Sequence, residues 1–122
     1  SADDARTALA QSGADGVMIG RGAYGRPWLL GQVMAALRGE GERPDPGLDE
    51  QYHVITSHYQ AMIDHYGETT GVNMARKHLG WYTKGLHGSA EFRNMANFID
   101  DADQVLGEIE RFYTPFLMQQ AA

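Results

Sequence analysis

Cysteine is absent from the 122 residues of the sequence, which excludes disulfides, thiolate metal sites and cysteine nucleophiles within them. Long apolar runs are also absent, since none approaches the roughly 20 residues that a helix needs to cross a membrane. The sequence does not open on a basic and then apolar leader of the secretory kind. We therefore expect a cytoplasmic protein with no membrane partner.

Net positive charge is lacking as well, because 10 basic residues stand against 16 acidic ones and the formal net charge is −6. This balance argues against a protein that binds nucleic acid over its whole surface. The charges are unevenly spread. Residues 94–122 are mainly acidic, whereas residues 68–93 are mainly basic and hold Arg76, Lys77, Lys84 and Arg93. The sequence therefore places a locally positive segment in an acidic chain.

The first third of the sequence predicts a helix, a strand and a second helix. Ser1 is a suitable cap for a helix over residues 1–12, and Gly13 ends it. A short buried strand is expected over residues 16–19, followed by a helix from about Pro27 to Arg38. The predicted apolar side of this second helix consists of Leu30, Val33, Met34 and Leu37. This α–β–α order is typical of one piece of a parallel sheet.

The rest of the sequence predicts a linker and four helices. Residues 39–47 are rich in glycine and proline, and we interpret them as the linker between two domains. Helices are then expected over residues 48–66, 68–84 and 89–97, and from about residue 101 onward. The first of these has the clearest apolar stripe, formed by Leu48, Tyr52, Ile55, Tyr59, Met62 and Tyr66. Short loops and one stripe per helix predict a helical bundle over residues 48–122, and a mainly α fold class.

Two segments are candidates for binding phosphate groups. The turn Gly20-Arg21-Gly22 follows the predicted strand, where small residues and open amides favour an anion, although a tight turn with nothing bound gives the same pattern. Arg76, Lys77 and Lys84, extended by Arg93, form a basic surface for a nucleic-acid backbone, with Trp81 available for stacking nearby. A merely solvated helix face is the alternative. The histidine spacing matches no metal motif, so no metal site is expected.

Two longer motifs resemble one enzyme family. Gly13-Ala-Asp-Gly-Val-Met-Ile-Gly-Arg-Gly-Ala-Tyr-Gly-Arg-Pro-Trp28 is similar to the last barrel strand and turn of bacterial tRNA-dihydrouridine synthases. His65-Tyr-Gly-Glu, followed by Met74-Ala-Arg-Lys-His-Leu-Gly-Trp-Tyr-Thr-Lys-Gly85, resembles the helical domain of the same family. The closest likeness is to the branch also labelled nitrogen-regulation protein. Both motifs occur in the family's order and spacing, and the resemblance covers essentially the whole chain.

The resemblance implies an FMN-dependent (β/α)₈ TIM barrel followed by a helical domain that holds tRNA. In such an enzyme uridine is reduced to 5,6-dihydrouridine, and NADPH reduces the flavin. Gly20 and Arg21 would then contact the FMN phosphate, residues 1–38 would be the end of the barrel, and residues 48–122 the tRNA-binding domain. The family's catalytic cysteine lies on an earlier barrel loop, so no catalytic residue is expected in this fragment.

Several expectations follow if the chain is such a fragment. By itself it should be inactive and retain little FMN, and the exposed edge of its lone strand should favour self-association. Two alternatives stay open. One is a helical protein-interaction or regulatory domain that binds no nucleic acid, and the other, weaker one is a piece of another FMN barrel oxidoreductase.

Overall fold

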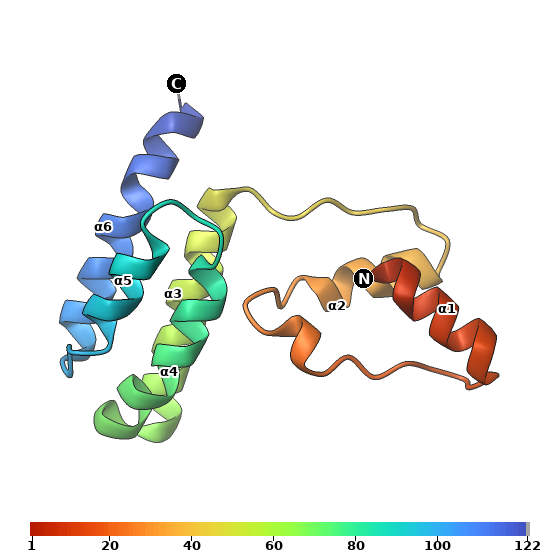
Figure 1. Ribbon diagram of the computed structural model, residues 1–122, viewed down its shortest axis with the longest axis horizontal. Coiled ribbons are helices and arrows are strands. Elements are labelled where there is room, and N and C mark those ends of the chain that lie inside the picture. The colour runs from red at the N-terminus through yellow and green to blue at the C-terminus, as the bar shows by residue number, and fades with distance from the viewer. Residues whose placement is uncertain (122) are drawn as a thin grey trace. The chain divides into compact units, whose positions relative to one another are not determined.

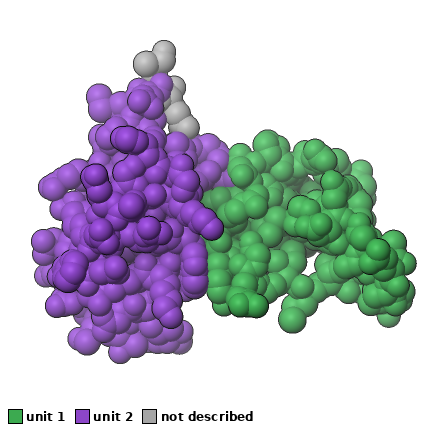
Figure 2. All heavy atoms as spheres, in the orientation of Figure 1, with its two compact units in different colours: residues 1–45 green, residues 46–122 purple. Residues whose placement is uncertain are grey.

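A computed structural model describes residues 1–121. The chain divides into two compact units, residues 1–45 and residues 46–122 (Figure 2). The described residues contain six α-helices, one short 3₁₀ helix (η1, Arg21–Ala23) and no β-strand (Figure 1). The mainly α fold class is therefore confirmed, and no barrel piece with a strand is formed. None of the helices described is long and apolar enough to span a membrane.

The first helix, α1 (Ala2–Ser12), forms as its end signals predict. The Oγ atom of Ser1 accepts a hydrogen bond from the Asp4 amide at 3.2 Å, and an Asp4 carboxylate oxygen accepts one from the Ser1 amino group at 3.1 Å. This reciprocal pair is a capping box, which satisfies amides at the helix start. Gly13 ends the helix in a left-handed conformation, with φ of 69°.

The predicted strand at residues 16–19 is wrong, because these residues form no strand. A strand requires a neighbour for its backbone N–H and C=O groups, and the described residues provide none. Val17 and Ile19 are instead partly buried against Ala5, Leu29 and Val33, while Met18 is 95% exposed. Because this strand does not form, its edge gives no support to the predicted self-association, which stays a prediction.

The second helix, α2 (Leu29–Leu37), begins at Leu29 instead of Pro27, because Pro27 and Trp28 lie in the turn before it. Its predicted apolar side is largely wrong. Val33 is buried, but Leu30, Met34 and Leu37 are all exposed. The side that is buried is a neighbouring one formed by Leu29, Val33 and Ala36. Both stripes are apolar at helical spacing, so periodicity alone did not distinguish them.

Asp45 fastens the end of the first unit to α2 and the turn before it. One carboxylate oxygen, Oδ1, accepts hydrogen bonds from Gln32 at 2.8 Å, Arg26 at 3.0 Å and Trp28 Nε1 at 3.1 Å. The bonds from Gln32 and then Arg26 lower the pKa of the Asp45 carboxyl below its ordinary value. These three bonds thus hold the end of the loop that follows α2 against α2 and the turn before it.

The second unit consists of four packed helices, α3 (Leu48–Tyr66), α4 (Glu68–Thr83), α5 (Ser89–Ala96) and α6 (Ala102–Ala121). Helix α3 contacts α4 and α6, and α5 contacts the same two helices, as Figure 1 shows. The side chains that are almost completely buried between them are Ile55, Tyr59, Leu79, Thr83, Ile109 and Tyr113. The four predicted helices all form.

Two glycines of this unit lie in contrasting surroundings. A Cβ atom at Gly71 of α4 would lie 3.0 Å from both the Cα atom of Ile63 and the carbonyl oxygen of Met62. The backbones of α3 and α4 therefore approach each other closely at Gly71. A Cβ atom at Gly107 of α6 would meet nothing within 4 Å.

Helix ends in the second unit follow the sequence in part. The Asp101 Oδ1 atom accepts a hydrogen bond from the Gln104 amide at 2.8 Å, so Asp101 caps α6. At the start of α5, Gly88 holds the capping position with φ of 80°, and Ser89 is the first helical residue. Pro115 lies inside α6, which continues beyond it to Ala121.

Two buried tyrosines provide a test of hydroxyl pairing. The Tyr59 hydroxyl is buried and has no hydrogen-bond partner among the described residues, whereas the Tyr82 hydroxyl lies 2.8 Å from His58 Nδ1. Because an unpaired buried hydroxyl is unfavourable, we expect Tyr59→Phe to raise the free energy of unfolding by up to about 1 kcal/mol. Tyr82→Phe should lower it by about the same amount, since a formed bond is lost.

Urea unfolding followed by far-ultraviolet circular dichroism measures both changes. Each substitution removes one hydroxyl oxygen and leaves the ring in place, so each is the control for the other. Equal destabilisation by the two substitutions would contradict the described environment of Tyr59.

Candidate nucleic-acid interface

The four side chains predicted to contact nucleic acid line one hollow of the second unit, of about 590 Å³. Arg76 and Lys77 come from α4, Lys84 directly follows it, and Arg93 comes from α5. The hollow, here called the basic groove, is completed by Gly80, Trp81 and Asn97. Cations from α4 and α5 thus line the same hollow, which agrees with the prediction that Arg93 extends the basic surface.

Helix geometry explains the order of groups along the basic groove. Lys77, Trp81 and Lys84 follow one another at steps of four and three, which brings side chains to the same helix face. All three side chains are exposed, Trp81 at 37%. Among the described residues, neither lysine forms an ion pair. The groove therefore presents two cations with an indole between them.

Gly80 allows Arg93 of α5 to join this face. A Cβ atom at Gly80 would lie 3.0 Å from the Cδ atom of Arg93 and 3.4 Å from its Cγ atom. The aliphatic stem of Arg93 therefore lies across α4 where that helix has no side chain. The sequence pattern alone indicates no role for Gly80 or Asn97. A glycine inside a helix is a signal of close packing, and it was available at Gly80.

Arg76 differs from the other cations of the groove because its guanidinium is already engaged. One terminal nitrogen donates to Asp100 Oδ1 at 2.8 Å and to the Ile99 carbonyl oxygen at 3.3 Å. The Nε atom is buried and has no partner among the described residues. Arg76 thus holds the segment before α6 against α4, and its charge is partly neutralised by Asp100.

A row of rings supports Trp81 from within the second unit. The His78 ring stands edge-on to Trp81, with centroids 5.1 Å apart and planes at 89°. His58 contacts His78 at 5.0 Å, and its Nδ1 atom lies 2.8 Å from the Tyr82 hydroxyl. Burial lowers the pKa of both histidines, so both rings favour the neutral form. His78 is thus a packing residue that also orients Trp81.

The described residues contain no group of three or more side chains arranged to hold a metal ion. His58 and His78 lie together, yet their neighbours are the rings of Trp81 and Tyr82, which are poor metal ligands.

The turn at Gly20 and Arg21 belongs to the first unit and is open to solvent. The carbonyl oxygens of Gly20 and Arg21 accept from the amides of Ala23 and Tyr24, each at 3.1 Å. Within residues 1–121, the amides of Gly20, Arg21 and Gly22 donate to no acceptor. A Cβ atom at Gly20 would meet nothing within 4 Å, so an anion has access to the backbone there. The turn therefore fits a phosphate group.

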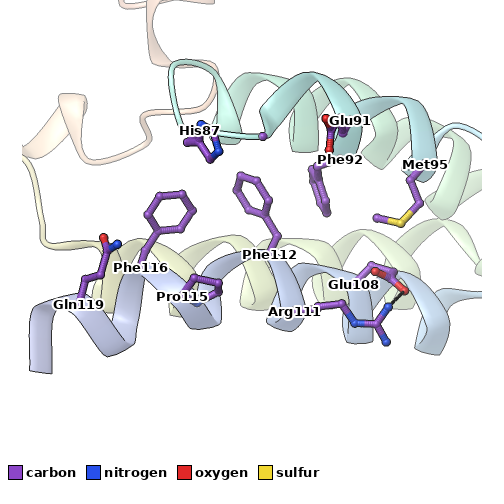
Figure 3. Close-up of a pocket in the computed structure, with 11 residues that line it drawn as sticks. His87, Glu91, Phe92, Met95, Glu108, Arg111, Phe112, Pro115, Phe116 and Gln119 are labelled. Carbon is purple, nitrogen blue, oxygen red and sulfur yellow. Dashed lines mark hydrogen bonds and ion pairs between the residues drawn. The ribbon is translucent and has the colours of Figure 1, made fainter.

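A second hollow, of about 600 Å³, lies between α5 and α6. Its floor is formed by the rings of Phe92, Phe112 and Phe116, as Figure 3 shows. At one end Arg111 donates to Glu108 at 3.0 Å. Its lining is apolar and aromatic with carboxylates at the edge, which suits apolar groups better than phosphates.

Comparisons with known proteins agree on one family. Residues 1–117 match the family described as Dihydrouridine synthase (Dus). The chain is 47% identical over 116 residues to a probable tRNA-dihydrouridine synthase of Rickettsia bellii, covering 95% of this chain and 36% of that protein. For one from Rickettsia conorii the identity is 50% over 110 residues, with 90% and 33% covered.

A relative outside that genus gives the same result. The chain is 37% identical over 114 residues to tRNA-dihydrouridine synthase B of Pseudomonas putida, covering 93% of this chain and 34% of that protein. The chain spans about a third of the length of these curated relatives.

Proposed function

The chain belongs to the dihydrouridine synthase family, and we propose that it forms the RNA-holding part of an enzyme that reduces uridine to 5,6-dihydrouridine in tRNA. The observation that supports this role is the basic groove, where Lys77, Lys84 and Arg93 converge from two helices around Trp81. Exposed cations in one concave surface are what a phosphate backbone requires. The groove concentrates positive charge in a chain whose formal net charge is −6.

In this proposal the cations of the groove have two roles. Lys77, Lys84 and Arg93 contact phosphate oxygens and release the counterions condensed on the RNA. Arg76 keeps the segment before α6 in place through Asp100 and contributes a weaker attraction. Such contacts position the RNA and carry no base specificity by themselves.

The first unit contributes a cofactor contact in the proposed enzyme. The open amides of Gly20 and Arg21, with the positive side chain of Arg21, hold the phosphate of FMN at this turn. When bound, FMN supplies the reducing equivalents for the uridine ring, and NADPH replenishes them. Because the sequence contains no cysteine, it has no counterpart of the proton donor that the family resemblance implies. We accordingly propose that this chain alone neither retains FMN nor reduces uridine.

The proposed function is tested by titrating unmodified tRNA with the 122-residue chain at several salt concentrations. Three contacts to phosphates predict that log K falls against log salt concentration with a slope of about −2 to −3. Fluorescence anisotropy of labelled tRNA measures the affinity at each salt concentration. Absent binding at low salt, or an affinity that does not change with salt, would rule out the proposed groove contacts.

The hollow between α5 and α6 favours a second candidate, a protein-interaction domain. Its aromatic floor of Phe92, Phe112 and Phe116 is apolar, and its edge carries Glu91 and Glu108. In that case tRNA affinity would be negligible at all salt concentrations, so the same titration distinguishes the two functions.

A further inference from the structure

The placement of Trp81 narrows the kind of RNA that the basic groove accepts. Lys77 and Trp81 lie on one face of α4, Lys84 directly follows that helix, and Arg93 reaches the same hollow from α5. A phosphate-binding surface alone needs only cations and polar donors. Proteins that bind single-stranded nucleic acid combine aromatic rings, on which the bases stack, with cations that contact the phosphates. A large aromatic ring among the cations is this arrangement.

Trp81 is also held in a defined orientation. Its ring meets the edge of His78, which contacts His58, and His58 lies 2.8 Å from the hydroxyl of the buried Tyr82. This row of rings connects the groove to the core between α3 and α4. A ring that is already oriented loses little conformational freedom when a ligand stacks on it.

Paired and unpaired bases respond differently to such a ring. In an A-form duplex each base is stacked on its neighbours, and proteins contact the backbone and the 2′-hydroxyl groups. An indole gains a stacking partner only where a base is unpaired and turned outward. The cations of the groove do not make this distinction, because every strand carries phosphates.

We propose that Trp81 is a stacking platform for an unpaired base, so that the basic groove takes a single-stranded or looped segment of RNA in preference to a duplex. This inference rests on the proposed function. In the bound state one base lies against the indole, and its flanking phosphates lie near Lys77 and Lys84. His78 is the positioning residue that fixes the ring.

A fluorescence experiment tests the stacking directly. The sequence contains two tryptophans, and Trp28→Phe leaves Trp81 as the only indole. Titration of this variant with single-stranded oligouridylate should quench the indole emission. A blunt RNA duplex with the same number of phosphates should bind with little quenching. Equal quenching by both RNAs, or none by either bound RNA, would overturn the proposal.

Affinity measurements separate the ring from the charges. Trp81→Ala should weaken binding of the single-stranded RNA roughly 5- to 100-fold. It should change duplex binding less than about twofold and leave the salt slope unchanged. Trp81→Phe should restore most of the affinity, because a ring is present again. This recovery would show that the weaker binding of Trp81→Ala is not caused by a loss of folding. Lys77→Ala should weaken both RNAs and reduce the salt slope.

The possible outcomes are distinct for the two proposals. If Trp81→Ala leaves single-stranded binding unchanged while Lys77→Ala weakens it, the stacking platform is refuted and the proposed function stands. If neither substitution changes the affinity, both fail.

Discussion

Replacement of Lys77, Lys84 and Arg93 together by alanine is expected to weaken tRNA binding by roughly 10- to 100-fold at physiological salt. These side chains line the basic groove and are exposed, and they form no ion pair within the part of the chain that the structure describes. Each contact with a phosphate releases condensed counterions, and loss of the contact forfeits that release.

The salt dependence provides the sharper measurement of this variant. Its slope of log K against log salt concentration should be shallower by about 2, whereas a variant that merely misfolds in part would lose active protein at every salt concentration alike. Circular dichroism and the urea midpoint confirm that the helices remain. Because Lys77 and Lys84 are exposed, a change in stability beyond about 0.5 kcal/mol at either position is not expected. Loss of the Arg93 stem, which packs against α4 at Gly80, should lower the stability somewhat more.

A matched control is available in the first unit. Arg6, Arg38 and Arg43 are exposed and lie outside the groove, so their joint replacement by alanine removes the same net charge. This control should change tRNA affinity less than about threefold. If the two triple variants weaken binding equally, attraction by net charge explains the affinity and the groove has no special part in it.

Replacement of Gly71 by alanine is expected to lower the free energy of unfolding by up to about 2 kcal/mol, although alanine is the better helix former. The added Cβ would lie 3.0 Å from Ile63 Cα and from the Met62 carbonyl oxygen, which are backbone atoms that cannot move independently. Overpacking of this kind costs about 1–3 kcal/mol, and the gain in helix propensity, about 1 kcal/mol, offsets only part of it.

Gly107→Ala is the matched control, with the opposite expected sign. Gly107 lies within α6, is exposed, and leaves open space where its Cβ would be. The same chemical change should therefore raise the free energy of unfolding by up to about 1 kcal/mol. Urea midpoints at constant m-value measure both variants. Stabilisation by Gly71→Ala would mean that α3 and α4 are further apart than described.

The helices were predictable from the sequence because their determinants are local. Ser1 and Gly13 mark the ends of α1, and the stripe containing Ile55 and Tyr59 marks α3. The absence of a strand at residues 16–19 was not predictable, because strand formation depends on partners remote in sequence. Which side of α2 is buried, that of Leu29 or that of Leu30, was not predictable either, because it depends on contacts with α1.

Most of the candidate site was predictable as a set of residues, but not as a geometry. Counting charges identified Lys77, Lys84 and Arg93. It did not reveal that Gly80 makes room for Arg93, or that Arg76 is bonded to Asp100, a residue 24 positions away. Contacts between helices decide both facts, and no local pattern encodes them. Whether these residues bind RNA stays a prediction.

The burial pattern of Val17, Met18 and Ile19 has a consequence for assembly. Two side chains turn toward Ala5, Leu29 and Val33 while the one between them is exposed, which is the in–out alternation of a sheet residue. A neighbouring strand would then need to supply only backbone hydrogen bonds, and no side chain of this segment would have to move to the opposite face. Packing against the helices thus already determines which face of this segment each of the three side chains occupies, before any strand pairs with it.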